Sequence, residues 1–391
     1  MHPPDPSVVP RSVAQAEGLA RELARTPAPC FEATERPVRR ALAIGDPQAP
    51  LRTFLQILAG HDALGEDGRL RPDLRLVSLG DHFDWGRRDQ RRAATDDALA
   101  LLAWLSAHAP DQVALLIGNH DLGRVGELAE IDQPTFEAAH AEAARIYDGP
   151  PGPGAEETAF CARYPCFPTA EVAARDFAAF SVEQRTLVST LLRRGRLVFA
   201  EASGPDLLLN HAGVTRWELA ALGLPQSVHS DAHVVAQALN AALADAVRGW
   251  TTGPLRVPHL HQPGSAATGE GGGALYHRPA DPTLGAPAEF TGPSRRRYDP
   301  RHLPHGLTQA IGHIRDAKCR ALMPGWSDDA RPTDGILRSL LTDGRAVGYG
   351  HGLRDATGLR GIWFLDAGMQ HVSPGDYPLL DLNTRSIAAR I

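Results

Sequence analysis

The feature that most constrains the fold is a short apolar run that recurs along the chain and ends abruptly in polar residues. Such runs, when bounded by glycine, are typical of buried β-strands. They occupy residues 41–44, 76–79, 113–117, 207–209, 307–311 and 361–365. Helical patterns lie between the early runs, at Leu51–Ala59 and Thr95–His108. This alternation predicts an α/β fold.

The residues that follow these runs are of types that bind metal ions. The runs lead into Gly45-Asp46, Gly80-Asp81, Gly118-Asn119-His120-Asp121, Asn210-His211 and Gly312-His313. The chain has only four asparagines, and two of them, Asn119 and Asn210, directly precede these histidines. Functional residues of α/β folds cluster just beyond the carboxyl ends of strands. The ordered set, more than any single pair, therefore predicts one polar site.

The organisation along the chain suggests one large domain with an arm and two insertions. Residues 1–35 form a proline-containing N-terminal arm with a helical pattern from Val13 to Ala24, and residues 36–391 form the domain. The insertions span about 125–205, which looks helical, and about 215–305, which has a helical pattern and then a loop rich in glycine and proline. Loops of this length are often functional lids. We interpret both insertions as caps over the site.

Composition excludes several classes of protein. The formal net charge of −6 argues against nucleic-acid binding, which needs a basic surface. Four cysteines in 391 residues do not make a disulfide framework. Neither a signal peptide nor an apolar run long enough to span a membrane is present. We therefore expect a soluble cytoplasmic protein without a membrane partner.

The ordered motifs resemble those of the calcineurin-like metallophosphoesterases. Within that superfamily they are most similar to the phosphoprotein-phosphatase branch, which includes Ser/Thr phosphatases and symmetrical diadenosine tetraphosphatases. The branch has the pattern G-D-x-H-G, G-D-x-V-D-R-G, G-N-H-E/D, H-G/A-G and a final G-H. The resemblance spans roughly residues 40–370, but only these short motifs are specific. It implies a two-sheet sandwich with layers α/β/β/α, interrupted by helical and Gly/Pro-rich loop insertions.

The resemblance also implies two divalent metal ions, with Mn, Fe or Zn as candidates. Asp46 and Asp81 would bind the first ion, and Asp81 would bridge to the second. Asn119, His211 and His313 would complete the second. Carboxylate, amide and imidazole ligands suit these metals.

The same resemblance assigns the catalytic pair and exposes a departure from the family. His120 would act as a general acid, oriented by Asp84. The family has histidine where this chain has Gln48, which either ligates the first metal or hydrogen-bonds a metal-bound water. His82 could compensate only if its side chain faced the site, and adjacent residues of a strand face opposite ways.

Substrate contacts are the least specific part of the resemblance. Trp85 stands where the family often has a phosphate-binding arginine, and Arg87 or Arg88 could replace that arginine. Arg278, in a segment similar to the Trp-x-Arg element of the family, is a second candidate. For these arginines a solvated loop position is the alternative.

Two late residues also enter the comparison with the family. His351 is an alternative to His313 as the final histidine, although the apolar run before it is shorter. Asp366 resembles the late Asp-Thr-Gly element and is expected to shape the site without binding metal.

These features predict a metal-dependent phosphatase that hydrolyses a phosphomonoester with water activated by two metals. The final motif is Gly-His-Ile rather than the Gly-His-x-His of many phosphodiesterase relatives, so the resemblance favours a monoester over a diester. The substrate could be a phosphorylated small molecule, a nucleotide or a phosphoprotein. One alternative is a hydrolase of nucleotides or dinucleoside polyphosphates. The other is a non-catalytic, metal-stabilised binding protein, which Gln48 and Trp85 would favour.

Overall fold

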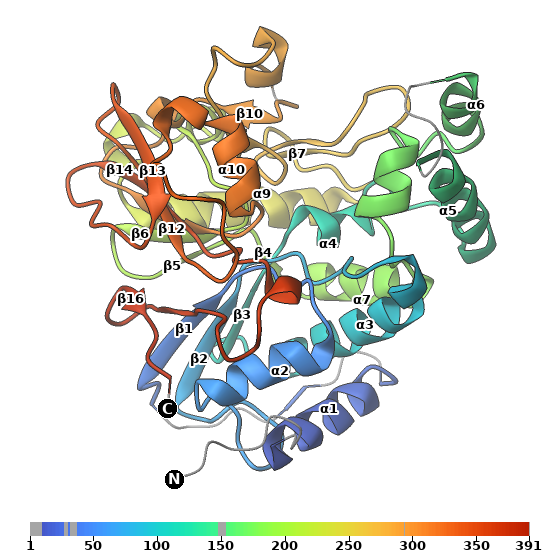
Figure 1. The fold of residues 1–391 in the computed structure, drawn as a ribbon, viewed down its shortest axis with the longest axis horizontal. Coiled ribbons are helices and arrows are strands. Elements are labelled where there is room, and N and C mark those ends of the chain that lie inside the picture. The colour runs from blue at the N-terminus through green and yellow to red at the C-terminus, as the bar shows by residue number, and fades with distance from the viewer. Residues whose placement is uncertain (1–9, 27–29, 32–36, 148–153, 293, 391) are drawn as a thin grey trace.

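The computed structural model describes residues 10–26, 30–31, 37–147, 154–292 and 294–390. In this described part the principal strands form two six-stranded sheets (Figure 1). The first has the order β16-β15-β1-β2-β3-β4 and the second the order β13-β12-β14-β11-β6-β5. The first sheet contains β1 (Arg40–Ile44), β2 (Leu74–Ser78), β3 (Val113–Leu116), β4 (Leu197–Val198), β15 (Leu380–Asp381) and β16 (Ser386–Ile387). The second contains β5 (Ala200–Ala202), β6 (Leu207–Asn210), β11 (Thr308–Ile311), β12 (Arg338–Thr342), β13 (Val347–His351) and β14 (Arg360–Phe364).

Within each sheet the central strands run parallel to one another. In the first sheet β1, β2, β3 and β4 pair in parallel, and in the second β6, β11 and β14 do so. The carboxyl ends of parallel strands meet at one edge, where ligands bind in α/β folds. All six apolar runs predicted as strands are strands, with ends that differ by at most two residues.

The core between the sheets explains why the apolar runs are continuous. Adjacent residues of a strand face opposite sides of the sheet. Ala43, Val77 and Leu116 of the first sheet share an apolar cluster with Leu209 and Ala310 of the second. The intervening residues of the first sheet, such as those at 42, 44 and 76, pack in another cluster with the helices. The structure thus confirms the predicted α/β/β/α sandwich.

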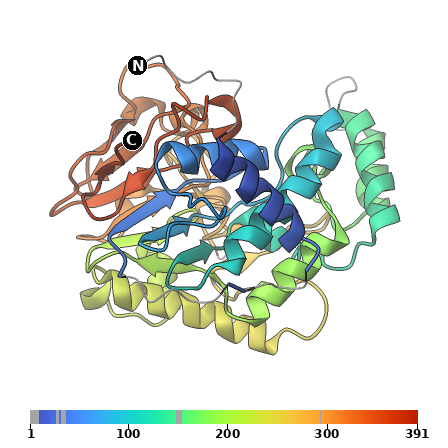
Figure 2. The same cartoon turned by 90° about the horizontal axis from the view of Figure 1, so that it is seen from below.

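Helices cover the outer faces of both sheets (Figures 1 and 2). The first sheet carries α2 (Leu51–Gly60), α3 (Arg91–Ala107) and α7 (Val182–Arg193), and the second carries α9 (Ala232–Gly249) and α10 (Asp316–Leu322). The arm contributes α1 (Arg11–Leu23), whose buried residues pack against α2 and α3. None of the helices in the described ranges is both long and apolar enough to cross a membrane.

The first insertion is shorter than the sequence suggested. Residues 128–180, which we call the cap, hold α5 (Gln133–Tyr147), α6 (Ala155–Arg163) and their own aromatic cluster of Phe136, Phe160, Phe167, Phe177 and Phe180. The cap helices α5 and α6 project to one side, away from the C-terminal strands (Figures 1 and 2). The rest of the expected insertion contains α7, β4 and β5, which belong to the sandwich.

The second insertion begins with α8 (Arg216–Ala221) and α9 and then follows an irregular path. Its short strands are β7 (His261–Gln262), β8 (Gly272–Gly273), β9 (Arg278–Pro279) and β10 (Arg297–Tyr298). Because α9 packs on β5 and β6, it is also part of the sandwich. We call residues 251–298, which follow α9, the distal loop.

Candidate active site

A cleft of about 630 Å³ lies where the central strands of both sheets end. Its lining includes most of the predicted site residues: Asp46, Gln48, Asp81, Asn119, His120, Arg278 and His313. Asp84 and His211 lie just beneath that surface, in contact with His120 and Asp81. The cap contributes Arg175 and the distal loop contributes Glu270, so both insertions reach the cleft.

Glycines allow the loops of the cleft to approach one another closely. A Cβ atom at Gly118 would lie 2.1 Å from Oδ1 of Asp81, and one at Gly312 would lie 1.8 Å from Oδ1 of Asp46. Asp81 and His313 have positive φ angles of 56° and 67°. Non-glycine residues adopt this left-handed conformation at a cost, and such strain is concentrated at functional sites.

Asp121, for which we predicted no role, ties the loops together. Its Oδ2 accepts hydrogen bonds from the backbone N–H of Gly118 (2.8 Å) and of Asp81 (3.0 Å). Its Oδ1 accepts from the N–H of His82 at 2.9 Å. Asp121 is the third residue of the short helix α4 (Asn119–Gly123), where an acid commonly caps the N-terminus. That position was the signal in the sequence.

Three of the predicted ligands form a cluster with the geometry of a metal site. One ligand atom each from Asp81, His211 and His313 lie within 4.8 Å of one another. Oδ1 of Asn119 is 3.1 Å from Nε2 of His211. Nδ1 of His211 contacts the Leu79 carbonyl oxygen at 2.8 Å, so this nitrogen carries the proton and Nε2 is left for a ligand.

His313 is held in the same way by the opposite nitrogen. Its Nε2 contacts the carbonyl oxygen of Tyr276 at 3.0 Å, which leaves Nδ1 for a ligand. Its backbone N–H donates to both oxygens of Asp46, at 3.1 and 2.8 Å. The loop after β11 therefore fixes a histidine and a carboxylate together.

The charges in the cleft fit a bound cation. Asp46 and Asp81 are each only 3% exposed, and neither pairs with a lysine or arginine of the described chain. Burial, together with the neighbouring carboxylates of Asp366 and Asp81, raises the pKa of Asp46 well above its usual value. Buried carboxylates without basic partners are costly unless a cation balances them. The carboxylate, amide and imidazole donors present suit a divalent transition metal.

His120 and Asp84 form a hydrogen-bonded pair beside this cluster. Nδ1 of His120 is 2.8 Å from Oδ2 of Asp84. The Asp84 carboxylate also accepts from Nη1 of Arg124 (2.7 Å) and from the N–H of Ala179 in the cap (2.9 Å). Burial opposes a charge on His120, but Asp81 and Asp84 outweigh it and raise its pKa to about 9.

Sequence reasoning missed the role of Arg124. Its side chain is fully buried and lies over the ring of Phe83, 4.6 Å from the ring centroid. Its position four residues after His120 was the available signal, because residues four apart share one face of a helical turn. A buried arginine that contacts Asp84 keeps that carboxylate charged.

The two residues considered for the missing family histidine differ in orientation. Gln48 lines the cleft, and its Nε2 donates to the Phe83 carbonyl at 3.1 Å, so Oε1 is the atom available to a ligand. His82 is fully buried, with its ring nitrogens at 2.9 Å from Ser78 and 3.0 Å from Asp121. Both nitrogens of His82 are therefore occupied, and the ring does not face the metal cluster.

The two predicted substrate arginines lie in different places. Arg278 lines the cleft, donates to the Tyr276 carbonyl at 3.3 Å and forms no ion pair within the described chain. Burial lowers the pKa of Arg278. Arg87 is not in the cleft: its side chain is 83% exposed and lies 3.9 Å from Asp89. The chain turns outward at Gly86, whose φ is 80°, while Trp85 packs inward. We therefore do not assign Arg87 to the substrate.

The late residues are also separated by the structure. Asp366 lines the cleft, and its Oδ1 accepts from the N–H of Gly368 at 3.1 Å. His351 lies on β13, outside the lining of the cleft, with Nε2 2.8 Å from Asp316. Of the two candidates for the final histidine, His313 is the one in the cleft.

Known proteins similar to the chain give little information on their own. A cold-active protein tyrosine phosphatase from a psychrophilic Shewanella is 13% identical, with 92% of this chain and 79% of that chain covered and a TM-score of 0.34. A protein serine/threonine phosphatase from Saccharomyces cerevisiae is 12% identical, with 95% and 82% covered and a TM-score of 0.36. Scores this low support no conclusion about fold or substrate.

One curated protein matches over a short stretch. A component of the pikromycin polyketide synthase of Streptomyces venezuelae is 43% identical over 72 residues, which are 18% of this chain. The match covers only 2% of that protein's length, so it indicates nothing about activity.

A family model gives the informative match. The model of the calcineurin-like phosphoesterases matches residues 39–240, just over half of the chain. The matched segment contains Asp46, Asp81, Asn119, His120 and His211, which meet at the cleft. The chain therefore belongs to the calcineurin-like phosphoesterase family and is a metal-dependent phosphoesterase.

Proposed function

We propose that the protein is a phosphatase that hydrolyses a phosphomonoester at a pair of divalent cations in the cleft. The observation that carries this proposal is the meeting of two kinds of group. Asp46 and Asp81 are buried carboxylates without a lysine or arginine partner in the described chain, and His120 is hydrogen-bonded to Asp84 beside them. The carboxylates serve cation binding, whereas the His–Asp pair serves proton transfer. A purely structural metal site would not need the His120–Asp84 pair.

The predicted ligands divide between two cation positions. Asp46 and Gln48 would hold one cation, Asn119, His211 and His313 the other, and Asp81 both. Bound divalent cations would supply the positive charge that activates water and offsets the charge of the phosphate. The carbonyl contacts of His211 and His313 support this assignment, because each leaves one nitrogen free. The donor set suits Mn, Fe or Zn.

His120 is the proposed general acid. Its Nδ1 is engaged by Asp84, so the transferable proton is at Nε2, which lies 3.9 Å from Oδ2 of Asp81. Burial acts to raise the pKa of Asp84, but Arg124 and His120 outweigh it and lower that pKa. Asp84 therefore stays ionised and holds the imidazole in place while Nε2 protonates the leaving oxygen.

Arg278 is the proposed phosphate ligand. Its guanidinium lines the cleft and has no carboxylate partner in the described chain. A desolvated arginine without a counter-ion is well suited to a planar, two-pronged contact with phosphate oxygens.

The charges around the cleft favour one phosphate over a polyphosphate chain. Arg175 pairs with Glu171 at 2.6 Å and with Asp176 at 2.9 Å. Arg315 pairs with Asp334 at 2.5 Å. Arg278 and Lys318 are then the cationic side chains of the cleft lining that have no ion pair in the described chain, and two cations are few for the additional phosphates of a dinucleoside polyphosphate.

The test is p-nitrophenyl phosphate hydrolysis by metal-stripped protein, with and without added Mn²⁺, in parallel with Asn119→Ala. We expect turnover that requires the metal and that the substitution abolishes. Asp62→Asn is a matched control, because Asp62 lies at the opposite end of the first sheet. Absence of turnover with Mn²⁺, Fe²⁺ and Zn²⁺ would overturn the proposal and favour a non-catalytic metal-binding protein.

A further inference from the structure

Next to His120, a small pocket extends from the cleft towards the interior. This inner pocket has a volume of about 110 Å³. Its walls include Pro168, Val172 and Phe177 of the cap, Tyr276 of the distal loop and Glu127 of the segment after α4, and charged side chains of the cap and the distal loop line it as well. Asn119, His120 and Arg278 border both spaces, so the inner pocket opens directly onto the proposed reaction centre.

Glu127 is the unusual feature of this pocket. It is 5% exposed, and its Oε1 accepts from the N–H of Gly264 (2.8 Å) and from the hydroxyl of Tyr276 (2.7 Å). Its Oε2 is buried and has no hydrogen-bond partner in the described chain. An unpaired buried carboxyl oxygen destabilises the folded state, because the atom has lost its hydrogen bonds to water without gaining others. A substrate group that binds next to Glu127 could provide the missing hydrogen-bond partner of Oε2.

Glycines shape the pocket around this carboxyl group. A Cβ atom at Gly123 would lie 2.5 Å from the ring of Phe177 and 3.5 Å from Oε2 of Glu127. A Cβ atom at Gly271 would lie 2.5 Å from the ring of Tyr276. Larger residues at either position would displace an aromatic wall. The rings of Phe177 and His120 are 6.2 Å apart, so this wall also flanks the proposed acid.

From this arrangement we propose that the inner pocket binds the leaving group of the substrate, with Glu127 as the residue that recognises a hydroxyl on it. The proposal rests on the proposed function, because it uses His120 as the acid that protonates the leaving oxygen. A leaving group protonated by His120 must lie beside it, and the inner pocket is the enclosed space there. The substrate class is then the phosphate monoester of a small alcohol that carries a second hydroxyl.

A hydroxyl fits Glu127 better than an amine does. Burial raises the pKa of Glu127, against the hydrogen bonds from Gly264 and Tyr276, which lower it. A hydroxyl can donate to an ionised carboxylate or accept from a neutral carboxyl, so it pairs with Oε2 in either state. An ammonium group needs the ionised form.

The size of the pocket limits the leaving group. Its volume of about 110 Å³ is below the roughly 150 Å³ of a protein cavity that binds one benzene molecule. A short diol or triol fits this space, whereas a nucleoside does not. Pro168, Val172 and Phe177 supply an apolar wall for the carbon chain.

The experiment compares matched substrates in wild-type protein with Mn²⁺. The substrates are ω-hydroxyalkyl phosphates from propyl to pentyl, each paired with the alkyl phosphate in which a methyl replaces the terminal hydroxyl. We expect a ratio of kcat/KM that favours the hydroxyl by roughly ten- to a hundredfold at one chain length or more. Equal values at every chain length would overturn the proposal.

Substitutions then assign the preference to Glu127. Glu127→Gln keeps a hydrogen-bonding group and should retain a preference for the hydroxyl. Glu127→Met should reverse it towards the methyl partner. Glu130→Met, at an exposed position on the same segment, should leave the wild-type ratio unchanged. An unchanged ratio in Glu127→Met would remove Glu127 from recognition.

Because each result is a ratio within one variant, a general loss of activity cancels. If Glu127→Met does not fold, the wild-type ratio still decides.

A binding measurement separates this proposal from the proposed function. Phosphonate analogues of the same pairs, with CH₂ in place of the ester oxygen, are not hydrolysed, and calorimetry measures their Kd. Tighter binding of the hydroxyl form without hydrolysis of any ester would support the inner pocket and overturn the phosphatase. Hydrolysis of the esters with equal binding of both analogues would support the phosphatase and overturn the proposal for the inner pocket.

Discussion

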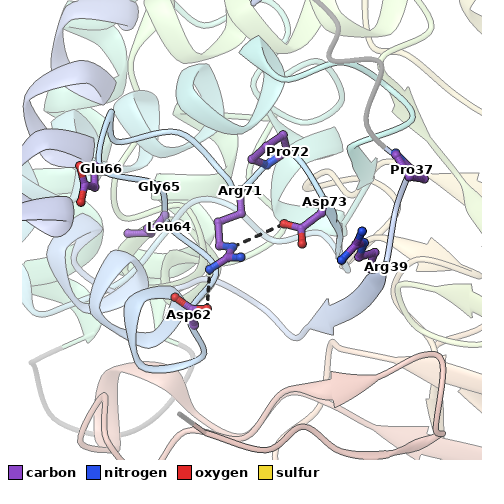
Figure 3. A pocket seen from close by; sticks show the side chains of 9 residues that line it. All are labelled: Pro37, Arg39, Asp62, Leu64, Gly65, Glu66, Arg71, Pro72 and Asp73. Carbon is purple, nitrogen blue, oxygen red and sulfur yellow. Dashed lines mark hydrogen bonds and ion pairs between the residues drawn. The ribbon is translucent and has the colours of Figure 1, made fainter.

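Two cavities of similar size lie at opposite ends of the first sheet, and they differ in how their charges are arranged. The cleft has about 630 Å³ and the other cavity about 680 Å³. The second, which we call the amino-end cavity, is lined by Pro37, Arg39, Asp62, Leu64, Gly65, Glu66, Arg71, Pro72 and Asp73 (Figure 3). Arg39 and Asp73 directly precede β1 and β2, so this cavity is at the end of the sheet where those strands begin.

In the amino-end cavity two of the acids are paired with an arginine. Arg71 lies 2.6 Å from Asp62 and 3.4 Å from Asp73, and the side chains of Arg71 and Asp62 are more than 40% exposed (Figure 3). In the cleft, Asp46 and Asp81 are buried and lack such a partner in the described chain. The two cavities therefore differ little in volume, but these two acids of the cleft are buried without an arginine partner in the described chain, whereas Asp62 of the amino-end cavity is partly exposed and paired with Arg71.

The largest difference between the two cavities should appear in metal-dependent turnover. Asp81→Asn removes the carboxylate that is proposed to hold both cations, so we expect turnover to fall below detection and metal binding to weaken. Asp73→Asn in the amino-end cavity should leave kcat/KM within about twofold of wild type, as expected for an exposed pair. Loss of turnover in both variants would contradict the comparison.

Removal of the proposed acid should give the next largest effect. His120→Ala should lower kcat by about 10²–10⁴-fold for alkyl phosphates, because their leaving oxygen needs a proton. The loss should be smaller for p-nitrophenyl phosphate, whose leaving group needs little protonation. Metal content should not change. An equal loss for both substrates would argue against proton donation by His120.

Metal addition should stabilise the fold through the cleft. At a Mn²⁺ concentration about a hundredfold above its Kd, binding to the native state contributes about 2.7 kcal/mol per site. We expect a rise in Tm on Mn²⁺ addition that persists in Asp73→Asn and shrinks in Asp81→Asn. A rise that shrank only in Asp73→Asn would locate the cation at the amino-end cavity instead.

The effect of Asp46→Asn on the stability of the fold should change sign between metal-free and Mn²⁺-loaded protein. Burial and the nearby carboxylates disfavour an ionised Asp46, so Asp46→Asn should stabilise the chelator-treated protein by about 1 kcal/mol, the scale of an ordinary substitution. With Mn²⁺ present, the Asp46→Asn protein should be less stable than the wild-type protein. Thermal unfolding with and without chelator measures both. Destabilisation under both conditions would mean that the hydrogen bond to His313 outweighs the repulsion.

The smallest expected effect concerns Gln48. Gln48→His should tighten Mn²⁺ binding at one of the two positions by roughly tenfold, because imidazole binds transition metals more strongly than an amide does. Calorimetric titration of metal-stripped protein measures this change. An unchanged titration would place Gln48 outside the metal ligands.

The sequence predicted the parts of the fold that are encoded locally. Each central strand is a continuous apolar run, and each site motif follows its strand directly, so the local pattern alone was enough to predict that Asp46, Asp81 and Asn119 lie together, and all three line the cleft. The edge strand β13 was not predicted, because its sequence Val347–His351 contains two glycines and no apolar run. The limits of the first insertion were also not predictable, since α7 has a helical pattern like those of the cap.

Contacts between distant segments account for what the sequence did not show. Arg87 and Arg278 were comparable candidates, and only the outward turn at Gly86 separates them. Glu127 lies in a stretch with an ordinary helical pattern, and its partners Gly264 and Tyr276 are in the distal loop, 137 and 149 residues later. A local pattern cannot show which residues of two insertions meet.

The most direct test of the central claim follows bound metal and turnover in the same samples. Metal-stripped protein is titrated with Mn²⁺ while bound Mn²⁺ and p-nitrophenyl phosphate hydrolysis are both measured. We predict that two equivalents bind, and that turnover rises as the second is taken up. Tight binding of two equivalents without turnover, or turnover that does not depend on bound metal, would contradict the assignment of the cleft as a two-cation phosphatase site.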